Sequence, residues 1–238
     1  MKLFPTLVVD DFLEDPDYVL DLAKNAEYND PGLTNHPGVS SKKHINHIDK
    51  ELFEYVHLKL LGIYWDLKNP VAYNTRMDFL KIDYNYEGIL NVGPIHVDSE
   101  KGDVCAGLVY LNKNPIKDTG TSFYKKLDNN YVNSEEHYLE PMRRHHAGEH
   151  VEGIEKIKQD HFDKFEETMR VQSQYNRLIT YGSDVYHAST TFGTGQTRYI
   201  MRFFMISVDS KHQDFPLRRW VYHITNCHKH PHRVLFYA

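Results

Sequence analysis

The chain has only two cysteines, Cys105 and Cys227, and no long apolar run. Two cysteines do not make a disulfide framework, and so few are typical of a reducing compartment. No apolar stretch approaches the roughly 20 residues that a membrane span needs, and the first residues lack the apolar core of a signal peptide. The sequence therefore predicts a soluble, cytoplasmic protein with no membrane partner.

An excess of basic residues is also missing, because the formal net charge is −5. Proteins that bind nucleic acid carry a basic surface, so nucleic acid is not an expected partner. Tyrosine and phenylalanine are plentiful, at 17 and 12 residues, and aromatic residues favour strands. The composition thus favours a β-rich protein that binds something other than nucleic acid or lipid.

The pattern of apolar and turn residues predicts one domain, mainly β with flanking helices. We expect an N-terminal strand and helices over about 1–73, a core over about 74–210, and a C-terminal extension over about 211–238. Helices begin after Asp15 and after Asp49, which are expected to cap them. A helical insertion covers about 127–172, with residues 151–171 read as one helix. The expected core strands lie near 75–84, 92–98, 104–111, 121–125, 176–181, 185–190 and 197–208, as in a sandwich, jelly roll or barrel.

Four His-x-Asp tripeptides occur, where chance placement of the 16 His and 19 Asp would give about one. Residues two apart share one face of a strand but lie about 200° apart around a helix, so only a strand lets both reach one ion. His161/Asp163 lies in the helical insertion, Asp49 of His47/Asp49 is explained as a cap, and too little chain follows His212/Asp214 to complete a barrel. The remaining pair, His96 and Asp98, is the predicted pair of metal ligands.

A third ligand is expected from a later strand, and His187 follows the turn at 182–184 on such a strand. Two histidines and one carboxylate leave three metal positions free, as in non-haem Fe(II) oxygenases. Arg198, eleven residues further on, suits a bidentate pair with a carboxylate of a metal-bound cosubstrate. Arg202 shares the face of Arg198. Either a carboxylate in the pocket or a structural salt bridge would explain it.

In this order and at these spacings, the residues resemble the Fe(II)/2-oxoglutarate-dependent dioxygenases, in particular their prolyl-4-hydroxylase-like branch. The resemblance covers about 79–207, interrupted by the insertion, and continues through "HVDSEKGD…YLNKN…GTSFY". It implies a double-stranded β-helix (jelly roll, cupin-like) core and Fe(II) held by His96, Asp98 and His187.

The same resemblance implies that Arg198 and Tyr110 hold the distal carboxylate of 2-oxoglutarate, and that Tyr86 lines the same pocket. Arg202 is a candidate only through its place on the strand, either to support the cosubstrate or to form a salt bridge. An enzyme of this kind uses Fe(II), 2-oxoglutarate and O2 and releases succinate and CO2. The intact Asp98 favours hydroxylation, because family members that halogenate have a small residue there. The expected substrate is an amino acid, a peptidyl side chain or another small metabolite.

Two alternatives stay open at this point. One is a cupin-like metal enzyme that does not use 2-oxoglutarate, and the other is a non-catalytic jelly-roll binding protein. Cys227 and the nearby histidines 228, 230 and 232 are not favoured as a zinc site, because structural zinc needs a second ligand pair. Oligomeric state does not follow from the sequence.

Overall fold

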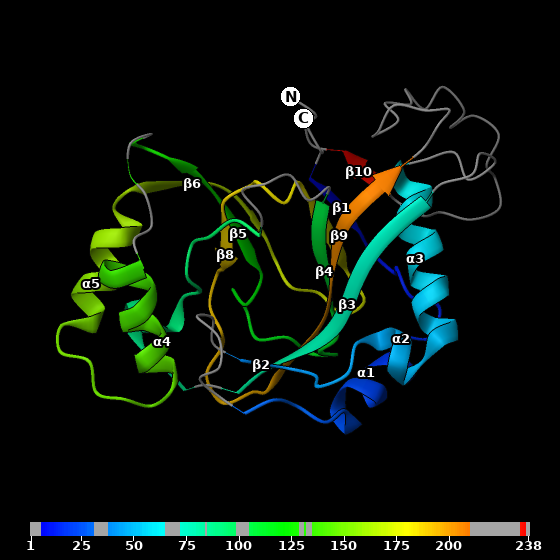
Figure 1. The fold of residues 1–238 in the computed structure, drawn as a ribbon, viewed down its shortest axis with the longest axis horizontal. Helices are drawn as coiled ribbons and strands as arrows, with labels where there is room; N and C mark the ends of the chain where they lie inside the picture. The colour runs from blue at the N-terminus through cyan, green and yellow to red at the C-terminus, as the bar shows by residue number, and fades with distance from the viewer. Residues whose placement is uncertain are drawn as a thin grey trace.

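The computed structural model describes residues 6–30, 38–64, 72–83, 85–98, 105–128, 131, 135–209 and 234–236. Within these residues, two β-sheets form the centre of the molecule and helices cover both outer sides (Figure 1). The expected C-terminal extension, with the His212/Asp214 pair and the cluster at 227–232, lies outside the described residues apart from a short strand at 234–236.

The larger sheet has the strand order β10-β1-β7-β4-β9-β3-β2, and the smaller sheet has the order β6-β5-β8. The larger sheet consists of β1 (Leu7–Val9), β2 (Val39–Ser40), β3 (Ala72–Ile82), β4 (Cys105–Tyr110), β7 (Leu178–Tyr181), β9 (Arg198–Asp209) and β10 (Val234–Phe236). The smaller sheet consists of β5 (Thr121–Lys126), β6 (Phe165–Val171) and β8 (His187–Ser189). All neighbouring strands run antiparallel. Apolar side chains from both sheets, among them Tyr110 and Phe123, pack between them.

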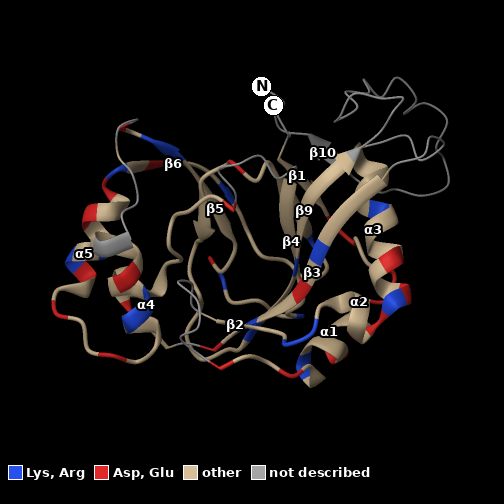
Figure 2. Cartoon of the chain, in the orientation of Figure 1, with Lys and Arg blue, Asp and Glu red and all other residues tan. Residues whose placement is uncertain are grey.

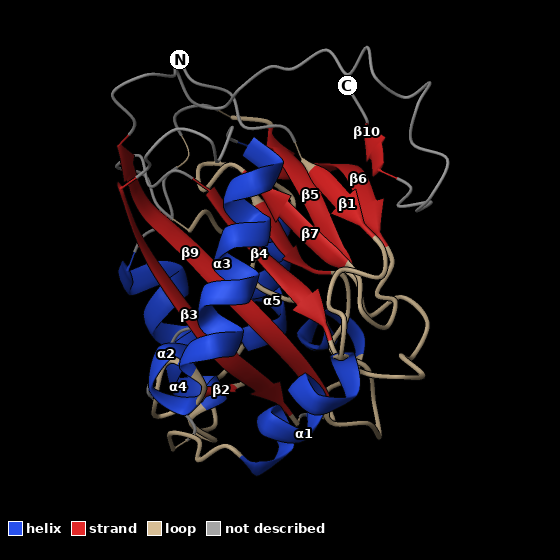
Figure 3. Ribbon diagram, turned by 90° about the vertical axis from the view of Figure 1, so that its right-hand side faces the viewer, coloured by secondary structure: helices blue, strands red, loops and turns tan. Residues whose placement is uncertain are grey.

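Helices α1 (Pro16–Asn25), α2 (Ile45–Ile48) and α3 (Lys50–Tyr64) cover the outer face of the larger sheet, and α3 crosses it in Figure 3. The expected caps are confirmed: Asp15 accepts from the Tyr18 amide and Asp49 from the Leu52 amide, both at 2.9 Å. Each satisfies one of the free N–H groups of a first helical turn, which contributes about 1 kcal/mol.

Alternate side chains of β9 point to opposite faces of the larger sheet, one toward the helices and one toward the smaller sheet. Met201, Phe203 and Met205 pack toward the helices, in the main apolar core. Ile200, Arg202 and Phe204 face the space between the sheets and line a cavity there. A fully buried Phe or Met side chain contributes about 1.5–3 kcal/mol to stability, so burial of these three residues against the helices fixes the register of β9. That register in turn determines which side chains of β9 point into the cavity.

The expected helix over 151–171 is only half right. Helix α5 (Ile154–Phe162) forms, but residues 165–171 form β6, which pairs with β5. The rest of the insertion contains the π-helical turn η2 (Glu135–Leu139) and α4 (Glu140–His146), which lie beside α5 in Figure 1. Thus the segment after β5 leaves the smaller sheet, forms a helical layer and returns to that sheet as its edge strand.

The expected strand over 92–98 is also wrong as a regular strand. A 3₁₀ helix, η1 (Gly88–Asn91), precedes it, and only His96 forms a β-bridge, with His187. Pro94 has no N–H for a ladder hydrogen bond, so regular pairing is interrupted there. The bridge at His96 and a hydrogen bond of 2.8 Å from the Gly93 amide to the Ser189 carbonyl still hold the segment against β8.

Each of α3, α4 and α5 carries both acidic and basic residues (Figure 2). Among the residues that the structure describes, no helix combines the length and apolarity needed to cross a membrane.

Candidate metal centre

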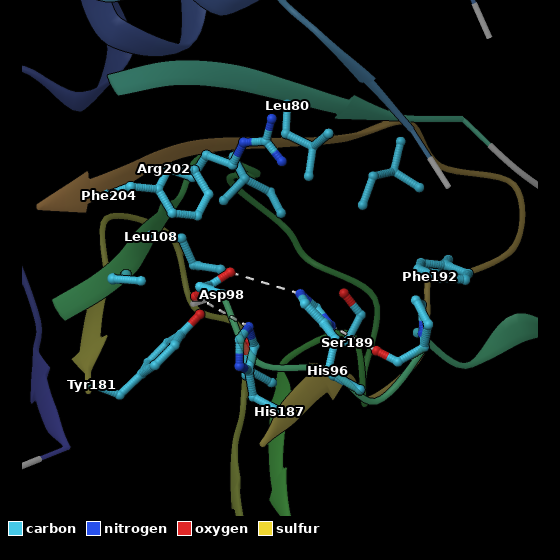
Figure 4. Close-up of a pocket in the computed structure, with 18 residues that line it drawn as sticks. Leu80, His96, Asp98, Leu108, Tyr181, His187, Ser189, Phe192, Arg202 and Phe204 are labelled. Carbon is cyan, nitrogen blue, oxygen red and sulfur yellow. Dashed lines mark hydrogen bonds and ion pairs between the residues drawn. The ribbon is translucent and has the colours of Figure 1, made fainter. Parts of the chain in front are cut away.

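His96, Asp98 and His187 come together in the wall of the cavity between the sheets (Figure 4). His187 begins β8, and its main chain exchanges two hydrogen bonds with that of His96, at 3.1 and 2.9 Å. The Asp98 amide donates to the Ser183 carbonyl at 2.9 Å. Main-chain contacts thus place all three side chains, and their possible ligand atoms lie within 4.8 Å of one another.

Both imidazoles turn Nε2 toward the Asp98 carboxylate. His96 Nδ1 lies 2.9 Å from the Pro94 carbonyl, and His187 Nδ1 lies 2.9 Å from the Val185 carbonyl. A carbonyl oxygen only accepts hydrogen bonds, so in each neutral ring Nδ1 carries the proton and Nε2 keeps its lone pair. The two Nε2 atoms lie 3.8 and 3.6 Å from the Asp98 carboxylate oxygens.

Three acceptors therefore face one another without a donor between them. Asp98 Oδ2 is buried and has no hydrogen-bond partner. Burial lowers the pKa of His187 to about 4, against the opposing effect of Asp98, so this ring is neutral at pH 7. Neutral imidazole and carboxylate are metal ligands. The donor set fits a divalent cation, and two histidines with one carboxylate fit Fe(II).

Arg198 is buried and points between the sheets. Its guanidinium donates to Ser189 Oγ at 3.1 Å and to the Thr191 and Gly120 carbonyls at 3.3 and 3.4 Å, and its Nε has no partner. Among the described residues, no carboxylate lies within ion-pair distance of it. Burial lowers the pKa of Arg198; this residue nevertheless stays charged at any ordinary pH. A cation held by neutral oxygens alone is suited to receive an anion.

Tyr110 lies beside this cation, with the Arg198 guanidinium 5.5 Å from the centre of its ring. Its hydroxyl is hydrogen bonded to Thr121 Oγ1 at 2.8 Å. Thr121 and Ser189 line the cavity that holds the three candidate ligands. The hydroxyls of Thr121 and Ser189 thus lie between that cavity and the side chains of Tyr110 and Arg198, to which they are hydrogen bonded.

Arg202 and Tyr86 are placed differently. Arg202 lines the cavity but makes a two-pronged ion pair with Asp78, at 2.5 and 3.2 Å, and donates to Ser40. Asp78 is its direct neighbour across β3 and β9. Of the two explanations that the sequence allows for Arg202, the structure shows the salt bridge. A second, smaller cavity is lined by Tyr110 and Arg198. Tyr86 lines neither cavity, and its ring lies 5.0 Å from that of His145.

Sequence reasoning missed three polar residues of the cavity: Thr121, Tyr181 and Ser189. Hydroxyl residues on strands carry no spacing signal of their own. Only Ser189 could have been found, because it lies two residues after His187 and so on the same face of β8. The remaining wall is apolar, with Leu80, Leu108, Phe192 and Phe204 (Figure 4).

The comparisons with known structures define the class of fold. A prolyl hydroxylase from Trichoplax adhaerens, solved with a hypoxia-inducible-factor peptide, matches with a TM-score of 0.51 at 13% identity, over 85% of this chain and 83% of its own. HygX from Streptomyces hygroscopicus, solved with nickel and 2-oxoglutarate, matches with a TM-score of 0.52 at 14% identity, over 84% and 82%. The 2-oxoglutarate-dependent epimerase SnoN of nogalamycin biosynthesis matches with a TM-score of 0.50 at 10% identity, over 90% and 88%.

The chain therefore has the double-stranded β-helix fold of the Fe(II)/2-oxoglutarate oxygenases, as expected. At these identities the likeness establishes the fold and not the activity. By sequence, the chain belongs to DUF6445, a family of unknown function, whose model matches residues 3–195. This range includes His96, Asp98 and His187 but ends before Arg198. No curated protein matches the sequence.

Proposed function

We propose that this protein is an Fe(II)- and 2-oxoglutarate-dependent oxygenase that hydroxylates an unactivated C–H bond. One observation carries the proposal: His96, Asp98 and His187 converge with three acceptor atoms and no donor, and both Nδ1 atoms are bound to carbonyl oxygens. This arrangement favours a bound cation, since three acceptors without a cation or a shared proton repel one another.

The second part of the proposal concerns 2-oxoglutarate. Arg198 is a buried cation without a carboxylate partner among the described residues, and it lies directly behind Ser189 of the cavity wall. Leaving a buried charge unpaired is costly, and a bidentate carboxylate is the strongest partner for a guanidinium. We assign the far carboxylate of 2-oxoglutarate to Arg198, with the hydroxyls of Tyr110 and Thr121 beside it.

Within this proposal, Fe(II) and 2-oxoglutarate supply the activation of O2, with release of succinate and CO2. The protein contributes three ligands from one side, which leaves positions for the cosubstrate and O2. Leu80, Leu108 and Phe204 give the cavity an apolar wall. The hydrogen bonds of His96 and His187 to the Pro94 and Val185 carbonyls hold the rings in the orientation that the metal requires.

The proposed substrate is a free amino acid, a peptidyl side chain or another small metabolite. The prolyl hydroxylase from Trichoplax adhaerens is solved with a peptide, and the epimerase SnoN belongs to nogalamycin biosynthesis. These two neighbours support keeping both a peptide and a small metabolite in the proposal. We propose in addition that residues 1–238 form a single oxygenase domain, with its core over about 74–210 and the helical insertion at about 127–172. Nucleic acid and membranes are not proposed as partners.

Anaerobic titration of the metal-free protein with Fe(II), and then with 2-oxoglutarate, tests the proposal. We expect one Fe(II) per chain and a visible charge-transfer band that appears only when 2-oxoglutarate is added. Neither should appear in His187→Ala. Iron binding without the band would favour a cupin-like enzyme that does not use 2-oxoglutarate, and no iron binding would favour a non-catalytic binding protein.

A further inference from the structure

Helix α5 turns an unusual face toward the candidate metal centre. Ile154, Lys158 and His161 are buried at positions i, i+4 and i+7 of this helix, which places them on one side. Two of the three are polar, and Lys158 is completely buried. Lysine is almost never fully buried without a partner, so this face needs an explanation beyond apolar packing.

Both polar residues bind one short segment of main chain. Lys158 Nζ donates to the Leu90 carbonyl at 3.3 Å and to the Val92 carbonyl. His161 Nε2 donates to the Ile95 carbonyl at 3.1 Å. The next residue is His96, so α5 holds three carbonyls of the segment that leads directly to the first candidate ligand.

The contact of His161 fixes the orientation of a single peptide plane. The carbonyl of Ile95 and the amide of His96 belong to the same planar unit. Its oxygen accepts from His161 at 3.1 Å and its N–H donates to the His187 carbonyl, also at 3.1 Å. The C=O and the N–H point in opposite directions within the plane, so these two hydrogen bonds restrain its rotation about the line between the two Cα atoms. This restrains the backbone from which the His96 side chain extends.

The tautomer of His161 is fixed as well. Because Nε2 donates to a carbonyl, Nδ1 is the acceptor, and the Tyr131 hydroxyl lies 2.8 Å from it. The ring of Tyr138 stacks on His161 with ring centres 3.8 Å apart. Burial lowers the pKa of His161 to about 4, so the ring stays neutral and keeps this donor.

Lys158 has no carboxylate partner among the described residues, and its ammonium lies 6.0 Å from the ring centre of Phe192, a residue of the cavity wall. Burial lowers its pKa to about 7, and either protonation state donates N–H groups to carbonyls. An apolar residue would pack at lower cost in such a place. The polar group is therefore explained by the carbonyls it holds.

We propose that Lys158 and His161 are positioning residues of the metal centre, which hold the segment 90–95 so that His96 Nε2 faces Asp98 and His187. This inference rests on the proposed function. It gives the insertion a role in the assembly of the site, in addition to the edge strand that it adds to the smaller sheet.

A matched pair of variants at His161 tests the proposal, with Co(II) as the probe. The amide nitrogen of His161→Gln reaches about as far as Nε2, whereas that of His161→Asn reaches only as far as Nδ1. We expect His161→Asn to weaken Co(II) binding by about 10- to 100-fold and to change the visible spectrum of the fully loaded protein. His161→Gln should stay within about threefold of the unmodified protein and keep its spectrum, since it retains the donor.

A second pair lies on the same helix. Lys158→Met should weaken Co(II) binding by about tenfold or more. The control is Lys156→Met, because Lys156 is exposed and contacts only Asp160, at 2.9 Å; it should bind Co(II) as the unmodified protein does. If His161→Asn does not fold, Lys158→Met decides by the same two readouts.

The outcomes separate the inference from the function on which it rests. If the unmodified protein binds no Co(II), both are overturned. If it binds Co(II) and His161→Asn has the same affinity and spectrum, the inference fails and the metal centre stands. An equal loss in His161→Gln and His161→Asn also overturns it, because the hydrogen bond to Ile95 would then not matter.

Discussion

Replacement of Arg198 by methionine separates the proposed cosubstrate site from the metal site. Methionine keeps much of the buried aliphatic volume and removes only the guanidinium. That group contacts neutral oxygens at 3.1, 3.3 and 3.4 Å and has no carboxylate partner within the described chain. Most of its interaction free energy is therefore available to a bound anion.

The size of the effect follows from the bonds that are lost. A charge-assisted hydrogen bond contributes about 1.5–3 kcal/mol, so a bidentate pair contributes at least about 3 kcal/mol. With 1.4 kcal/mol per factor of ten, 2-oxoglutarate should bind at least about 100-fold more weakly to Arg198→Met. Fe(II) affinity should change little, because none of the three candidate ligands touches the guanidinium. The ligand-free variant should be about as stable as the unmodified protein, since exchanging a buried ion for an apolar group is often neutral.

The assay is calorimetric titration of the anaerobic Fe(II) protein with 2-oxoglutarate, beside a separate titration with Fe(II) alone. Arg170→Met is the control, because this arginine is paired at the surface with Glu167 at 2.7 Å. Equal affinities for 2-oxoglutarate in Arg198→Met and Arg170→Met would refute the assignment of the anion site. Loss of Fe(II) binding in Arg198→Met would show that the arginine supports the metal centre instead.

Three further predictions concern the frame around the site. Asp78→Asn removes the carboxylate that pairs with Arg202 and should lower the free energy of unfolding in urea by about 3–5 kcal/mol. Asp78→Leu combined with Arg202→Met should recover most of that stability, and no recovery would contradict the pairing. Gly107→Ala should cost about 3 kcal/mol, because the new methyl carbon would lie 2.2 Å from the Ile179 carbonyl oxygen; thermal unfolding measures this, and an unchanged midpoint would contradict it. Burial lowers the pKa of His57 to about 4, so the unfolded chain takes up a proton first as the pH falls. Stability should then drop between about pH 6.5 and 4 by up to about 3 kcal/mol, and His57→Phe should remove that part; an equal pH dependence in both proteins would contradict it.

Local signals in the sequence predicted the elements that local forces determine. Asp15 and Asp49 were identified as caps because a carboxylate needs only the amide three residues ahead. The helix expected up to residue 171 failed for the opposite reason. Phe165 and Met169 are four residues apart, a spacing that fits one face of a helix and one face of a strand equally. Pairing with β5, about 40 to 50 residues earlier in the sequence, decides between them.

The candidate site shows the same difference between features that local sequence determines and features that distant contacts determine. His96 and Asp98 were selected on the premise of a regular strand, which the structure does not contain. The structure nevertheless brings both side chains close to that of His187, because an extended segment also directs alternate residues to one side. The sequence does not decide whether Arg202 forms a salt bridge, and it does not identify Asp78 as the partner, since register across β3 and β9 depends on packing in the core.

The charged residues around the cavity explain why we propose a metal and a dicarboxylate together. Arg202 and Asp78 neutralise each other across two strands. Asp98 and Arg198 are not neutralised by any charged partner among the described residues, and they carry opposite signs. The carboxylate faces the two imidazoles, while the guanidinium lies behind Ser189 in a separate layer, so no single small ion meets both. A cation bound at the triad and chelated by an acid that extends to Arg198 satisfies both charges at once. A metal alone, as in a cupin-like enzyme, would leave the buried guanidinium without an anion.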